Sequence, residues 1–227
     1  MLCYNYLMPG RLVPLVTDEI YHVFNKGIAS QSVFTNKSDY QRGEDSLLYY
    51  KHTNPPVKYS RLFSLHKDDR NDLLKQLEKE KNNLIDLITY CFMPNHFHLL
   101  LKQLVDNGIS QYLSNFTNSY TRYFNTKYER SGPIFQGKFK AVHVESNEQL
   151  LHVSRYIHLN PYSSSIVSSI EQLKAYPHSS LTKLSTSKVE SSLITDQFKN
   201  IDEYYKFVID NADYQKQLQT IKKLTLE

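Results

Sequence analysis

The sequence lacks both a disulfide framework and a run of apolar residues long enough to cross a membrane. Its only cysteines are Cys3 and Cys91, so it contains no CxxC metal-binding pair and no network of disulfides. No apolar stretch approaches the roughly 18 residues that a membrane span requires, and the first residues do not resemble a secretory signal. We therefore expect a cytoplasmic protein without a membrane span.

The composition indicates a globular protein with a mildly basic surface. The chain has 227 residues, of which 40% are hydrophobic and 13% aromatic, and this is enough to form a buried core. The formal net charge of +4 permits a polyanionic partner but does not require one. Whether the partner is a polyanion must therefore be judged from the positions of the charges along the chain.

The order of the predicted elements indicates an α+β fold. Strands are expected near residues 19–28, 84–93, 96–102 and 134–146, and helices near 38–50, 67–83, 109–130 and 147–160, followed by a helical segment from about 195. Ser38 and Asn147 are expected to cap two of the helices, and Pro161 is expected to limit the last of them. Two strands joined by a tight turn at Pro94 and Asn95 favour an antiparallel sheet.

The stretch "MPNHFHLLLK" places two histidines one residue apart in an apolar strand. Side chains alternate between the two faces of a strand, so His96 and His98 project to one side while Phe97 and Leu99 project to the other. Two histidines on one strand face are more often ordinary hydrogen-bonded side chains than ligands. The alternative is a pair of metal-binding imidazoles on a hydrophobic strand.

The helix predicted from Asn147 places Tyr156 and Asn160 one turn apart, on a different face from its apolar residues. If this helix packs across the histidine-bearing side of the sheet, it presents a phenol and an amide oxygen to His96 and His98. Two imidazoles and an oxygen ligand, with positions left for water and substrate, suit Mg²⁺, Mn²⁺ or Zn²⁺ at a catalytic site.

Four stretches in this order resemble a known family: "YHVFNKG", "YCFMPNHFHLLL", "RSGPIFQGKFKAVHV" and "LLHVSRYIHLNP". They span residues 19–162 and are similar to the single-tyrosine His-hydrophobic-His transposases of the insertion-sequence 200/605 type, most closely the REP-associated tyrosine transposases. The resemblance implies a ferredoxin-like antiparallel sheet with helices on one face, in a transposase domain over residues 1–165. Residues 166–227 would form a Ser-rich link and a helical C-terminal extension.

The resemblance also implies the roles of four residues. His96, His98 and Asn160 would hold a divalent metal, Mg²⁺ or Mn²⁺, and Tyr156 would attack a phosphate of single-stranded or hairpin DNA to form a 5′-phosphotyrosine intermediate. Insertion-sequence enzymes usually have Gln where this chain has Asn160, and Asn at that position resembles the REP-associated branch. A single tyrosine on the helix predicted over residues 147–160 disfavours the two-tyrosine replication initiators.

A segment rich in cations and aromatic residues precedes the predicted tyrosine helix and favours binding to nucleic acid. Cationic side chains follow phosphates, and aromatic rings stack on unpaired bases. The residues expected to contact DNA are Arg122, Lys127, Arg130, Phe135, Gln136, Lys138, Lys140 and Arg155.

Two other functions remain open from the sequence. One is a catalytically inactive, domesticated nucleic-acid-binding module that keeps the basic surface. The other is a metal-dependent hydrolase that uses water, which is weaker because no Asp or Glu stands beside the histidine pair as a general base. Either a monomer or a homodimer is compatible with the sequence.

Overall fold

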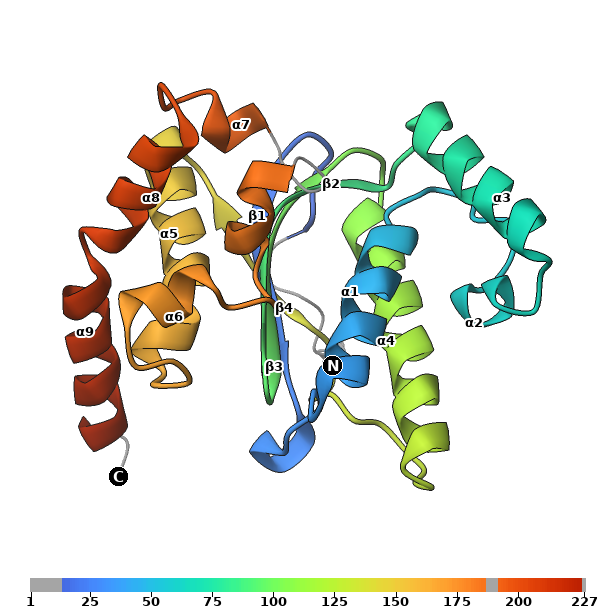
Figure 1. The fold of residues 1–227 in the computed structure, drawn as a ribbon, viewed down its shortest axis with the longest axis horizontal. Coiled ribbons are helices and arrows are strands. Elements are labelled where there is room, and N and C mark those ends of the chain that lie inside the picture. Colours follow the sequence, from blue (N-terminus) through green and yellow to red (C-terminus); the bar gives the residue numbers. More distant parts are fainter. Residues whose placement is uncertain (1–13, 187–191, 226–227) are drawn as a thin grey trace, which may run out of the picture.

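The computed structural model describes residues 14–186 and 192–225 and contains a four-stranded antiparallel sheet between two layers of helices (Figure 1). The strands lie in the order β2-β3-β1-β4, so β1 and β3 are central. Their bounds are β1 Ile20–Lys26, β2 Ile85–Met93, β3 His96–Gln103 and β4 Lys140–Val144. The predicted α+β class and antiparallel sheet are confirmed.

Helices cover both faces of this sheet. Helices α1 and α4 pack together over one face, and α5 crosses the other face with α8 and α9 outside it (Figure 1). The helices are α1 Lys37–Tyr49, α2 Tyr59–Leu62, α3 Lys67–Glu80, α4 Gly108–Lys127, α5 Asn147–Ser163, α6 Ile170–Lys174, α7 Ser192–Thr195, α8 Ile201–Ile209 and α9 Ala212–Thr225, with 3-10 turns η1 Ile28–Ser30 and η2 Ser180–Thr186. The expectation that helices lie on one face only is wrong, because the central strands also carry apolar residues toward α5.

The face under α1 and α4 is a dense aromatic core, which we call the aromatic face. Strand β3 contributes Phe97, Leu99 and Leu101, none of which is exposed to solvent. Phe116 from α4 packs on Phe97 with 5.4 Å between the ring centroids. Burial of this continuous apolar surface is the main source of stability for the sheet.

The opposite face, under α5, combines a second apolar cluster with the histidines of β3, and we call it the histidine face. Leu100 and Cys91 of the sheet lie in the same buried cluster as Ile157 of α5 and Val208 of α8. The C-terminal segment therefore packs onto this side of the sheet, and the backbone NH of Phe92 donates to a carbonyl of that segment. The proposed division of the chain at residue 165 stays a prediction.

Three details of the helix ends differ from expectation. Ser146, rather than Asn147, caps α5, because its hydroxyl accepts a hydrogen bond from the backbone NH of Gln149. Pro161 lies inside α5, which continues to Ser163 although a proline removes one helical hydrogen bond. In α1 the capping residue is Asn36 instead of Ser38.

No helix in the ranges that the structure describes combines the length and the apolar character needed to cross a lipid bilayer.

Candidate active site

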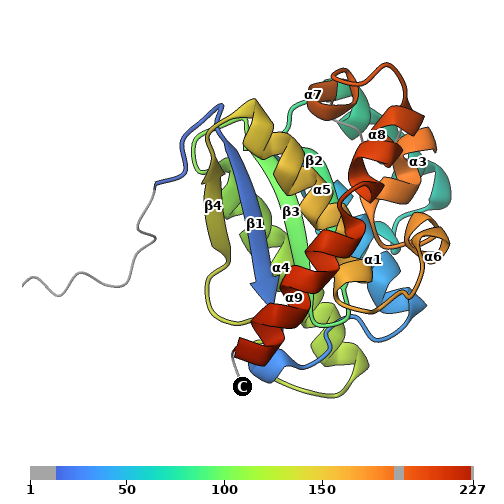
Figure 2. The same ribbon diagram turned by 90° about the vertical axis from the view of Figure 1, so that its left-hand side faces the viewer.

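Strand β3 places His96 and His98 side by side on the histidine face, with 5.0 Å between their ring centroids. Figure 2 views the sheet from this side, where α5 packs across β2 and β3. The alternation of side chains explains the geometry, since the intervening Phe97 points into the aromatic core. His98 therefore lies between the sheet and Tyr156 of α5, and His96 lies next to the turn between β2 and β3.

Each imidazole of the pair has a hydrogen-bond partner for its Nδ1 atom. Nδ1 of His96 lies 2.6 Å from Oδ1 of Asn95, in the turn between β2 and β3. Nδ1 of His98 lies 2.9 Å from Nε2 of His22, which projects from β1 onto the same face. No hydrogen bond among the described residues uses Nε2 of either His96 or His98, so this atom remains for a ligand.

All three histidines of this face are held in the neutral form. Burial lowers the pKa of His22 to about 4, and burial together with the nearby Lys26 lowers the pKa of His96 to about 4. Burial, followed by the charges of the other two imidazoles, brings the pKa of His98 well below its usual 6.5. A neutral imidazole offers one nitrogen lone pair, which is the form that binds metal ions.

The side chain of Tyr156, on α5, contacts His98 and His22 of the sheet. Its ring meets His98 edge-on, with 5.6 Å between centroids and an interplanar angle of 86°, and meets His22 at 5.9 Å. Its hydroxyl makes no hydrogen bond with the described residues, whereas its backbone carbonyl accepts from Asn160 and from Gln215 of α9. The helix is thus fixed by its backbone while the phenol oxygen stays unengaged.

Asn160 follows Tyr156 by one turn and is almost completely buried, with 2% of its surface exposed. Its Nδ2 donates to the Tyr156 carbonyl at 3.2 Å, and its Oδ1 has no hydrogen-bond donor among the described residues. An amide oxygen in this setting retains the lone pairs that a hard divalent cation prefers.

The donor atoms brought together here are of the kinds that bind a divalent cation. In the described part of the chain, no three His, Cys, Asp or Glu side chains are grouped to hold a metal ion, so a third protein ligand here would be an amide. Two neutral imidazoles with free Nε2 atoms, each oriented through Nδ1, have the arrangement seen around metal-binding histidines. Few protein ligands leave coordination positions for water and substrate.

A cavity of about 560 Å³ opens beside His96. Its lining includes Lys140 at the start of β4, Lys138 just before that strand, Gln136, and Lys26 of β1. These side chains are exposed, so their charges and amide groups are available to a polyanion. Three of the residues predicted to contact DNA are thus brought together next to the histidine pair.

Phe135 requires a correction, because it belongs to the core. Its side chain is 6% exposed and packs on Phe97 with 5.5 Å between ring centroids. An isolated bridge between Gly27 and Phe135 holds this segment against the end of β1. A ring buried in this way has no free face for a base, so Phe135 is not part of a DNA surface.

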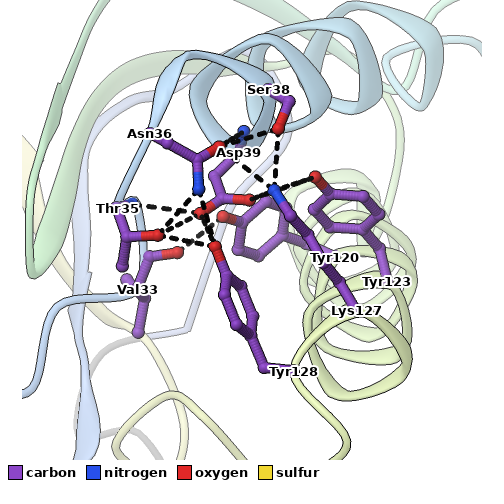
Figure 3. A network of polar contacts seen from close by, with 9 residues as sticks. All are labelled: Val33, Thr35, Asn36, Ser38, Asp39, Tyr120, Tyr123, Lys127 and Tyr128. Atoms are coloured by element: carbon purple, nitrogen blue, oxygen red, sulfur yellow. Dashed lines mark hydrogen bonds and ion pairs between the residues drawn. The ribbon is translucent and has the colours of Figure 1, made fainter.

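Lys127 is engaged elsewhere, in a network around the fully buried Asp39 (Figure 3). The ammonium group of Lys127 donates to Oδ1 at 2.6 Å, and the hydroxyl groups of Thr35 and Tyr128 donate to Oδ2 at 2.6 and 2.7 Å. Burial favours a raised pKa for Asp39, but the hydrogen bonds from Lys127, Thr35 and Tyr128 outweigh it, so the pKa lies below its usual 3.8. Lys127 therefore joins α4 to α1.

The three arginines predicted to contact DNA lie away from the cavity. Arg122 is exposed on α4, which covers the aromatic face. Arg130 donates to the side chain of Gln31 at 3.3 Å. Arg155 lies over the ring of Phe207 at 4.5 Å and contacts the amide of Asn211. Its guanidinium group is therefore bound to α8 and to the turn between α8 and α9.

Sequence reasoning missed His22, Asn95 and Lys26 as parts of this site. The alternation of β1 was a usable signal, because it places His22 and Lys26 on one face of their strand. The pairing of β1 with β3, which joins residues 76 positions apart at His22 and His98, was not visible in either strand alone.

Comparisons with known proteins agree with this geometry. A family model described as "Transposase IS200 like" matches residues 47–160, which is half of the chain. No curated protein matches. Among solved structures, a REP-associated tyrosine transposase bound to a REP hairpin has a similar fold, with a TM-score of 0.55, 13% sequence identity and coverage of 81% of this chain and 89% of that chain.

The residues matched by the family model include the two histidines of β3 and both Tyr156 and Asn160 of α5. The strand and most of the helix that form the candidate site therefore lie within the matched segment. With half of its length matched, the chain belongs to the IS200-like transposase family.

Proposed function

We propose that this transposase is a metal-dependent endonuclease and strand-transferase that acts on single-stranded or hairpin DNA through a 5′-phosphotyrosine intermediate. The observation that carries the proposal is the contact of the Tyr156 ring with His98, beside a lysine-lined cavity. A single chain supplies the tyrosine, both imidazoles and the basic residues.

His96 and His98, through their Nε2 atoms, and Asn160, through Oδ1, would hold Mg²⁺ or Mn²⁺. When bound, such an ion polarises the scissile phosphate and offsets the charge that develops on it during attack. A phenol is a weak nucleophile at neutral pH, so activation of the phosphate is needed for the reaction. The neutral state of the buried imidazoles supports this role, because an imidazolium has no lone pair with which to bind the ion.

Tyr156 supplies the nucleophile. Its oxygen forms a bond to the phosphorus while the bond from phosphorus to the 3′ oxygen breaks, the phenol proton passes to solvent, and the 3′ oxygen takes up a proton. The phosphotyrosine keeps the energy of the broken ester. The 3′-OH of another strand can then attack the same phosphorus and release Tyr156, which joins DNA without ATP.

The cavity beside His96 supports a path for the DNA backbone. Lys26, Lys138 and Lys140 place three positive charges along it, and contacts of this kind position phosphates without reading the sequence. The similar solved structure is bound to a REP hairpin, which favours a hairpin as the form of DNA that this chain recognises.

The test is a search for a covalent adduct. Full-length protein is incubated with Mn²⁺ and labelled hairpin oligonucleotides that carry varied flanking sequences, and the products are separated under denaturing conditions. We expect a protein–DNA adduct with the wild-type chain and none with Tyr156→Phe, which removes one oxygen and leaves the ring in place. The matched control is Tyr162→Phe on the same helix, whose hydroxyl is bonded to Asp213, and it should keep the adduct.

Three outcomes contradict the proposal in different ways. DNA cut without an adduct identifies water as the nucleophile and favours a hydrolase. An adduct that persists in Tyr156→Phe assigns the nucleophile to another tyrosine. Tight binding to hairpins with neither cleavage nor adduct, in Mn²⁺ or Mg²⁺, favours the inactive binding module.

A further inference from the structure

His22 lies on the histidine face and contacts both His98, a predicted metal ligand, and Tyr156, the predicted nucleophile. It lies on β1, where His22 pairs with Leu100 and Phe24 pairs with His98, so it is diagonal to His98 across the two central strands. Its Nε2 lies 2.9 Å from Nδ1 of His98, and its ring lies 5.9 Å from that of Tyr156. Residue 22 lies outside the segment that the family model matches.

The short distance between the two imidazoles requires one proton between them. Either Nδ1 of His98 carries it and Nε2 of His22 accepts, or Nε2 of His22 carries it and Nδ1 of His98 accepts. In the first arrangement Nε2 of His98 has a lone pair and faces the site ready to bind a cation. In the second arrangement Nε2 of His98 carries a proton, so it has no lone pair with which to bind a cation.

The partner of His96 shows how the neighbouring ligand avoids this ambiguity. Oδ1 of Asn95 can only accept, so Nδ1 of His96 must carry the proton and Nε2 of His96 must have the lone pair. His98 has no amide or carboxylate oxygen as the partner of its Nδ1 atom among the described residues, only the second imidazole. The state of His98 therefore depends on His22.

We propose that His22 is a positioning residue that accepts the hydrogen bond from Nδ1 of His98 and so holds Nε2 of His98 in the form that binds the divalent cation. This inference rests on the proposed function, since it assumes that His98 is a ligand. The contact of His22 with the Tyr156 ring gives it a second effect, because the same imidazole limits where α5 can place the phenol.

The experiment compares three substitutions in the full-length protein. His22→Leu removes the acceptor and keeps a side chain of moderate size, whereas His22→Gln places an amide oxygen about as far from the backbone as Nε2. His143→Leu is the matched control, because His143 lies on the neighbouring strand opposite Tyr21 and bonds to Glu19 instead of the site. Melting temperatures of the metal-free proteins show whether each variant is folded.

The first measurement is Mn²⁺ affinity by calorimetry. Loss of a partner that orients a ligand weakens metal binding by about 10- to 100-fold, and we expect this for His22→Leu. We expect His22→Gln to restore the affinity to near the wild-type value and His143→Leu to leave it unchanged. Equal affinity of wild type and His22→Leu overturns the inference. Equal weakness of His22→Leu and His22→Gln also overturns it, because it makes His22 a ligand itself.

The second measurement needs no metal. Nitrogen NMR of histidine-labelled, metal-free protein reports which nitrogen of each imidazole carries the proton, and we expect Nδ1 for His98 in the wild type. A proton on Nε2 of His98 overturns the inference whatever the affinities show. If the wild type binds no Mn²⁺, the proposed metal site fails, and the position of this proton still decides whether His22 orients His98.

Discussion

The two faces of the sheet differ in chemistry although the same strand supplies both. Toward α1 and α4, β3 presents Phe97, Leu99 and Leu101, all without solvent exposure. Toward α5 it presents His96 and His98, and the ring of His98 contacts those of His96, His22 and Tyr156. Alternate side chains of β3 thus point into two different environments, one on each face of the sheet.

The two faces also differ in whether the polar side chains named here are hydrogen-bonded within the protein. At the edge of the aromatic face, both carboxylate oxygens of Asp39 are bonded, with Lys127, Thr35 and Tyr128 among the donors. On the histidine face, Nε2 of His96 and the hydroxyl of Tyr156 have no hydrogen-bond partner in the described ranges. Both residues are partly exposed, so these two atoms are open to water or a ligand, whereas the Asp39 carboxylate is satisfied within the protein.

The first prediction concerns stability and uses two adjacent residues. Phe97→Ala removes a fully buried ring that packs on Phe116 and Phe135, and we expect it to lower the free energy of unfolding by about 4 kcal/mol. His96→Ala, one position earlier, should lower it by no more than about 1 kcal/mol, since a single hydrogen bond to Asn95 is lost. Urea unfolding of both variants measures the difference.

The same two variants should also differ in metal binding, and here His96→Ala should show the larger loss. His96→Ala should abolish calorimetric binding of Mn²⁺, because one of the proposed ligands is gone. Similar losses of stability in both variants would contradict the assignment of stability to the aromatic face.

The second prediction concerns the Asp39 network. Asp39→Asn keeps the shape of the side chain but removes its charge, which weakens the hydrogen bonds from Lys127, Thr35 and Tyr128. We expect a loss of about 2 kcal/mol in the free energy of unfolding at pH 7. Asp72→Asn, on the exposed surface of α3, is the control and should change it by less than about 0.5 kcal/mol.

The pH dependence of this effect has a defined sign. The pKa of Asp39 is lower in the folded chain than its usual 3.8, so the folded protein holds the proton less tightly than the unfolded chain. The stabilisation is therefore complete above about pH 4 and is lost as the pH falls through the lowered pKa. Urea unfolding at pH 7, 5 and 3 should show the gap between wild type and Asp39→Asn closing at pH 3. A gap that stays constant would show that the carboxylate is not its source.

Local alternation in the sequence predicted much of the sheet. The pattern of β3 is complete within eight residues, so the shared face of His96 and His98 follows from strand geometry alone. The α5 periodicity likewise placed Tyr156 and Asn160 on neighbouring turns. These features depend only on residues close together in the chain.

Features that depend on distant pairing were not predictable. Lys127 reaches Asp39 across 88 positions and His22 reaches His98 across 76, and neither partner is marked in its own segment. The aromatic and basic alternation before β4 could not distinguish a buried Phe135 from the exposed Lys138 and Lys140. Pro161 lies in the last turn of α5, and the backbone NH groups of Ile166 and Val167 donate to its carbonyl, so residues that follow the helix complete its end.

The third prediction tests whether the basic cavity belongs to the histidine face in function. Neutralising Lys138 and Lys140 together, as Lys138→Gln and Lys140→Gln, removes two cations that line the cavity beside His96. Each phosphate contact with a single strand contributes about 0.7 to the slope of log affinity against log salt, so the slope should become shallower by about 1.4. We expect affinity for hairpin DNA to fall about tenfold at moderate salt, which corresponds to about 1.4 kcal/mol.

The control for this last comparison removes the same kind of charge from the other side of the molecule. Arg122→Gln lies on the exposed surface of α4, over the aromatic face, and it should leave both the slope and the affinity unchanged. Fluorescence anisotropy with a labelled hairpin at four or more salt concentrations gives both quantities. A shallower slope for Arg122→Gln, with no change for the lysine pair, would place the DNA on the α4 side and separate it from Tyr156. A shallower slope for the lysine pair alone ties DNA binding to the face where the imidazoles and the phenol meet.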